Sequence, residues 1–162
     1  MALSNLGIFH TVIGVVAIAS AITGFIKSGK IDLQKLPGKM YFYLTLITSL
    51  TALGLSSVKG LNPGHILALL VIILISAAYF LSAKRQGNNR ARYFENFFLS
   101  FSFFLSMLPT VNETFTRIPV GHPLAAGPND PLIGISILLL FIMLIAGSVL
   151  QFRKQRQLNR VV

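Results

Sequence analysis

Long apolar stretches alternate with short polar segments along the whole chain. Five stretches approach the length that crosses a bilayer, which is about 20 residues for roughly 30 Å of hydrocarbon. We expect spans at residues 6–26, 40–58, 64–83, 93–117 and 131–152. The pattern therefore predicts an all-α fold over residues 1–162, a single transmembrane domain built as a bundle of five transmembrane helices.

The last two stretches differ in character. The fourth is rich in Phe and Ser, carries Glu95 and Glu113 near its edges, and contains Pro109, which we expect to weaken or kink its outer part. The fifth has almost no polar residues through its apolar run, so it faces lipid or docks a partner. The segment 118–131 between them contains four prolines and predicts an outer loop that caps the bundle.

Composition supports insertion into a membrane. The chain is 54% hydrophobic and 11% charged, whereas soluble domains carry about a quarter charged residues. It has no cysteine, which excludes disulfides, thiolate metal sites and cysteine nucleophiles. Residues 1–5 lack a basic segment of the kind that begins a cleavable signal peptide, so we expect the first span to be retained.

The basic residues predict the orientation. Three groups of four lie after spans one, three and five: Lys27, Lys30, Lys35 and Lys39; Lys84, Arg85, Arg90 and Arg92; Arg153, Lys154, Arg156 and Arg160. With five spans these groups share one side, and Lys59 and Arg117 lie on the other. The positive-inside rule then places the N-terminus outside and the C-terminus in the cytoplasm. We expect the basic tail, 153–162, to contact anionic lipid headgroups, and we expect no nucleic-acid partner.

One face of the first span is predicted to be buried. Its small residues recur at helical spacing behind a histidine: His10, Gly14, Ala17, Ala21 and Gly24. Small residues permit close packing between membrane helices. Because spans one and three run in the same direction, His65 should lie on the same outer side as His10.

Polar residues within the spans define a candidate site. At the outer end we expect a binding pocket formed by His10, His65, Asn112, Glu113, Arg117 and His122. A polar seam through the bundle would consist of Thr45, Thr48, Glu95, Ser102 and Ser106. Ionisable residues inside a membrane raise a functional hypothesis. Alternatively, Glu113 and Arg117 form a surface ion pair, and the hydroxyls bond to backbone carbonyls or across helices.

Three functions are compatible with this pattern. The first is a non-enzymatic accessory or scaffold subunit whose partners are the lipid bilayer and other membrane-protein subunits or copies of itself. The second is a redox protein that holds a single haem b or a metal ion through His10 and His65, with Glu113 as an oxygen ligand to the metal. The third is a transporter of protons or small solutes that uses the outer histidines and Glu95. Hydrolase spacings are absent.

The order of features resembles a family of small polytopic bacterial inner-membrane proteins of unknown function. The resemblance rests on four short segments: His10 with Gly14, Gly38-Lys39-Met40-Tyr41, Ala83-Lys84-Arg85, and Asn112-Glu113-Thr114-Phe115-Thr116-Arg117. It implies a multi-pass protein of the bacterial inner membrane. Gln34 stands where such proteins are expected to have a histidine, which disfavours haem.

Overall fold

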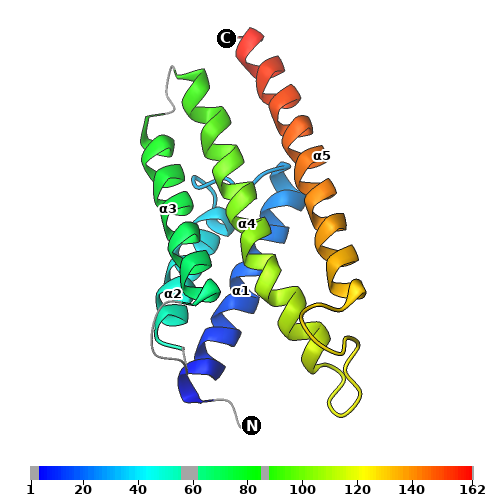
Figure 1. Cartoon of the computed structure of the whole chain (residues 1–162). Helices are drawn as coiled ribbons and strands as arrows, with labels where there is room; N and C mark the ends of the chain where they lie inside the picture. Colours follow the sequence, from blue (N-terminus) through cyan, green and yellow to red (C-terminus); the bar gives the residue numbers. More distant parts are fainter. Residues whose placement is uncertain (1–3, 56–61, 85–87, 162) are drawn as a thin grey trace.

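The computed structural model describes residues 4–55, 62–84 and 88–161, and side chains among these as far as residue 157. Within these ranges the fold is all-helical, with five helices and no strand (Figure 1). The helices are α1 (Asn5–Ser28), α2 (Leu36–Leu53), α3 (Pro63–Ala83), α4 (Asn89–Arg117) and α5 (Pro131–Val161). The all-α prediction is therefore confirmed.

The helix boundaries follow from local chemistry. Ser4 accepts a hydrogen bond from the Gly7 N–H and starts α1, and Gly29 ends it in the left-handed conformation at φ 71°. Asn88 caps α4 by accepting from the Ala91 N–H. Pro109 lies within α4 without interrupting it. Residues 56–58 of the predicted second span, Lys59 and Arg85 lie outside the described residues. The side chain of Arg160 lies outside the described side chains.

Four of the five helices, α1, α3, α4 and α5, are long and apolar enough to cross a membrane. This property marks the chain as a membrane protein. α2 has 18 residues and is not among the four. α5 is longer than its predicted span, because it continues as a helix through the basic segment after residue 152.

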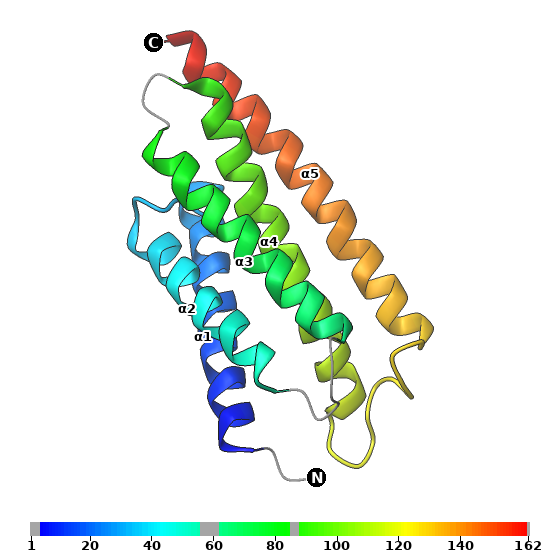
Figure 2. The same cartoon turned by 60° about the vertical axis from the view of Figure 1, so that its left-hand side comes forward.

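Successive helices run in opposite directions (Figures 1 and 2). The N-terminus and the 118–130 loop therefore lie at one end of the bundle, and the C-terminus lies at the other. The turn between α1 and α2 stops short of the end that α4 and α5 reach.

The main core lies among α1 to α4. It contains Ala17, Ala21, Tyr41, Ile75 and Leu99. The predicted buried face of α1 is confirmed, because Ala17, Ala21 and Gly24 are buried whereas Val15 and Ile26 are exposed.

α5 packs at the periphery, against α4. Only 11% of the most apolar 18-residue stretch of α5 is buried, compared with 39% of the corresponding stretch of α4. Ring contacts join the two helices at two levels, Phe104 with Phe141 and Tyr93 with Phe152. A second cluster of Val111, Ala125 and Ile133 fixes the outer loop beneath them. This position leaves a space between α5 and α1.

Candidate functional site

At the outer end, the two span histidines make structural contacts. His10 Nδ1 lies 3.0 Å from Thr51 Oγ1 on α2. Thr51 Oγ1 also lies 2.9 Å from the Thr48 carbonyl oxygen, to which its hydroxyl donates. His65 is 8% exposed and completes the N-terminal capping box of α3 with Asn62.

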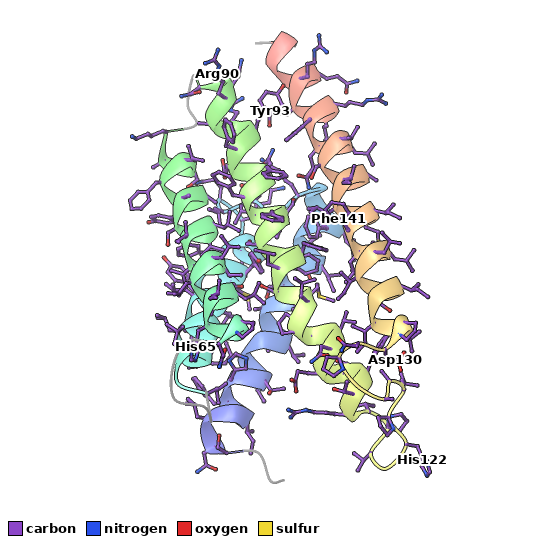
Figure 3. All side chains as sticks on the ribbon, in the orientation of Figure 1. His65, Arg90, Tyr93, His122, Asp130 and Phe141 are labelled. Atoms are coloured by element: carbon purple, nitrogen blue, oxygen red, sulfur yellow. The ribbon has the colours of Figure 1, made fainter. Side chains whose placement is uncertain are left out.

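The other predicted outer-pocket residues lie on α4 and in the outer loop. Glu113 and Arg117 form an ion pair at 2.6 Å, with both side chains more than half exposed. This geometry corresponds to the surface ion pair that the i, i+4 spacing allows. His122 lies in the outer loop, well away from His65 (Figure 3). Asn112 lies on α4, with a buried Oδ1 that has no hydrogen-bond partner among the described residues.

Glu113 does not join the two histidines in a three-ligand metal cluster. Among the described residues, no three histidine, aspartate or glutamate side chains lie close enough together to hold a metal ion. The use of His10 and His65 as haem or metal ligands stays a prediction.

The predicted polar seam lies inside the bundle. Tyr41 Oη and Ser102 Oγ lie 2.9 Å apart, and both residues are fully buried. Thr45 and Glu95 are also buried. However, Thr48 and Ser106 donate to carbonyls of their own helices, Leu44 and Ser102. These two hydroxyls therefore bond to backbone carbonyls, which is the alternative that the sequence left open for the seam residues.

A cleft between α1, α4 and α5 lies nearer the opposite end. Its volume is about 770 Å³, within the approximate range of 300–1,000 Å³ typical of ligand pockets. None of the predicted outer-pocket residues lines it. Its wall is mostly apolar and includes Ile22, Phe25, Phe103, Phe104, Met107, Leu140, Met143 and Leu144.

The polar residues of this α1–α4–α5 cleft gather towards the cytoplasmic side of the predicted topology. They are Ser28, Lys30, Asp32, Lys35, Asn96, Ser100, Ser148, Gln151, Lys154 and Gln155. On α5 the lining runs from Leu140 to Gln155, which is about 20 Å at 1.5 Å per residue. The cleft is thus apolar along most of its wall, and its mouth is polar and contains lysines.

A chain of hydrogen bonds joins the three helices at this mouth. Ser100 Oγ donates to Gln151 Oε1 at 3.2 Å, and Gln151 Nε2 donates to the Gly29 carbonyl at 3.1 Å. Gln151 is 8% exposed. A buried amide that both donates and accepts in this way holds α5 against both α4 and the end of α1.

Two other buried polar atoms in the cleft wall are not satisfied. Asn96 is 2% exposed and Ser148 is 7% exposed. Asn96 Oδ1 and Ser148 Oγ have no hydrogen-bond partner among the described residues. Such groups are costly without a partner, so they indicate where a ligand or water would bind.

Sequence reasoning missed this site although a signal existed. Ser148, Gln151 and Gln155 follow i, i+3, i+7 spacing, and Asn96 and Ser100 are spaced i, i+4. The prediction treated the fifth span as apolar and did not consider the polar residues on one face of its C-terminal part.

No protein-family model, curated protein or solved structure is significantly similar to this chain.

Proposed function

We propose that this chain is a non-enzymatic accessory protein of the membrane that binds one amphiphilic membrane molecule in the α1–α4–α5 cleft. The proposal replaces the predicted outer pocket with a site at the other end of the bundle. The partner subunits expected from the sequence remain part of the proposal.

The shape of the cleft supports an amphiphile. On α5 its apolar part, Leu140 to Gly147, runs about 10 Å, which is about a third of a hydrocarbon core of roughly 30 Å. Hydrophobic side chains favour a hydrocarbon chain there, and the polar mouth favours a hydrated group. Neither a fully polar solute nor a plain hydrocarbon would use both parts.

The observation that carries the proposal is the pair of unsatisfied buried atoms, Asn96 Oδ1 and Ser148 Oγ. Bulk lipid tails offer no hydrogen bond, so tails alone would leave both atoms unpaired. A ligand with hydroxyl groups near its headgroup could donate to each oxygen, because serine also accepts. The cleft is therefore suited to a specific occupant.

The proposed topology has five crossings, with the N-terminus outside and the C-terminus in the cytoplasm of a bacterial inner membrane. α1 and α3 point in the same direction, so α2 has to return across the membrane if both of them span it (Figure 2). The uneven distribution of basic residues supports the orientation. The cleft mouth then faces the cytoplasmic leaflet.

Filling the cleft tests the binding function. A Cβ at Gly147, which lines the cleft, would meet nothing within 4 Å, so we expect the side chain of Gly147→Leu to extend into the cleft. We expect the wild-type protein, purified in mild detergent, to retain one amphiphile per chain in native mass spectrometry. Gly147→Leu should lose it.

Gly134→Leu is the matched control. Gly134 lies on the same helix, also has open space around its Cβ position, and does not line the cleft. This variant should keep the bound molecule. Equal retention by both variants, or no retention by the wild type, would refute binding in the cleft.

The accessory role has its own test. Affinity isolation of the wild-type chain in mild detergent should recover a larger membrane protein together with it. Recovery of the chain alone, in a state that supports an enzymatic turnover, would contradict the accessory assignment.

A further inference from the structure

We infer that the amphiphile carries an anionic phosphate headgroup, held by Lys30, Lys35 and Lys154, and that it is a lipid of the cytoplasmic leaflet. This inference rests on the proposed function and adds the chemical class of the ligand. It concerns the cleft mouth, which joins Lys154 of the basic tail to Lys30 and Lys35 of the α1–α2 turn.

The three lysines come from two distant parts of the chain. Lys30 and Lys35 belong to the turn between α1 and α2, and Lys154 lies on α5. Lys35 Nζ donates to Ser28 Oγ at 2.9 Å. Lys154 Nζ lies 3.8 Å from the Cβ position of Gly29, so it reaches across to the end of α1. The fold thus brings cations from both sides to one mouth.

The charge at the mouth is positive. Among the described lining residues, Asp32 is the acidic one, and its Oδ1 accepts the Gln34 N–H at 3.1 Å. Three lysines against one carboxylate leave an excess of two positive charges. A phosphate ester would complement this charge, since lysine binds phosphate as a compact point charge.

The charges together with the apolar wall favour an anionic lipid over two other ligand classes. A zwitterionic headgroup would place its ammonium among lysines, where like charges repel. Inorganic phosphate could meet the lysines, but it would leave the apolar wall unused. An anionic lipid whose headgroup carries hydroxyls uses the lysines, the apolar wall and the two unsatisfied oxygens of Asn96 and Ser148.

The experiment compares lipids that share acyl chains but differ in headgroup. The whole protein is placed in nanodiscs of phosphatidylcholine that contain a minor fraction of phosphatidylglycerol or phosphatidic acid, and the lipid retained after extraction is measured by native mass spectrometry. We expect anionic lipid to be enriched over phosphatidylcholine by about tenfold, the factor that one charge-assisted contact gives.

Two charge-matched double variants separate the mouth from general electrostatics. Lys35→Gln with Lys154→Gln removes two lining lysines, whereas Lys39→Gln with Arg153→Gln removes two nearby cations that do not line the cleft. The first pair should abolish the enrichment and leave total lipid retention unchanged. The second should keep the enrichment. A saturating concentration of inorganic phosphate should displace nothing.

The outcomes distinguish the two proposals. If lipid is retained and Gly147→Leu removes it, but all headgroups bind equally, the phosphate inference is wrong and the binding function stands. If both double variants lose the enrichment equally, the lysines act as a general surface charge and the inference is overturned. If no lipid is retained at all, both proposals are wrong.

Discussion

Gly38 lies against the backbone of the α1–α2 turn, near the start of α2. A Cβ at this position would lie 2.1 Å from the Asp32 carbonyl oxygen. Because the neighbouring atom is backbone, Gly38→Ala should force the turn to move and destabilise the protein by about 1–3 kcal/mol. Thermal unfolding in detergent would measure this.

Gly127→Ala provides the comparison, because a Cβ there meets nothing within 4 Å. It should leave the unfolding midpoint unchanged. A Gly38→Ala protein as stable as the wild type would show that the turn does not pack as described. The resemblance segment includes Gly38, and this close approach gives a physical reason for glycine there.

Asp130 controls the start of α5 through its charge. Its carboxylate accepts N–H groups from Ala126 and Leu132, and these two bonds lower its pKa below the ordinary value of 3.8. A carboxyl whose folded pKa is lowered contributes stability that is complete above its unfolded pKa. The contribution should be lost as the pH falls below about 3.8 through the folded pKa.

Thermal midpoints measured across this acidic range test the effect (Asp130 is labelled in Figure 3). Asp130→Asn keeps a side-chain acceptor but cannot titrate, so its midpoint should fall less with acid than that of the wild type. Parallel curves for the two proteins would argue that Asp130 does not stabilise the loop through its charge.

At the scale of elements, the position of α5 depends on the polar contacts at the cleft mouth. Ser100 and Gln151 form a hydrogen bond between α4 and α5, and Gln151 also donates to the Gly29 carbonyl. A double-mutant cycle with Ser100→Ala and Gln151→Leu should give a coupling free energy on the order of 0.5–1 kcal/mol, as found for hydrogen bonds between membrane helices. Reversible unfolding in detergent would measure it.

The control for this cycle uses Ser136, also on α5. Its hydroxyl donates to the Leu132 carbonyl of its own helix. Ser136→Ala with Gln151→Leu should therefore show additive effects. Coupling in both cycles would mean that the substitutions disturb α5 as a whole.

At the scale of the whole molecule, the alternation of helix direction makes a topological prediction. A reporter fused after Val162 should be cytoplasmic, and one inserted after Gly121, in the exposed outer loop, should be outside. Paired fluorescent-protein and alkaline-phosphatase fusions would measure both. If the two positions report the same side, the five-crossing arrangement is wrong.

The sequence by itself determined the helices and the buried face of α1. Both depend on local periodicity, since every backbone group inside a membrane must bond within its own helix and small residues mark close packing. The approximate spans and the interior position of Thr45 and Ser102 could be read from the same spacing. Orientation and crossing number follow from charge, and they stay predictions.

Only the tertiary structure decided where a ligand could bind. The outer histidines each have a partner of their own, Thr51 for His10 and Asn62 for His65, and their shared pocket stays a prediction. The cleft depends on where α5 lies relative to α1, and the bond that fixes this joins residues 122 positions apart. Periodicity carries no information about contacts at such a separation, so Lys35, Asn96 and Lys154 could not be grouped before the fold was known.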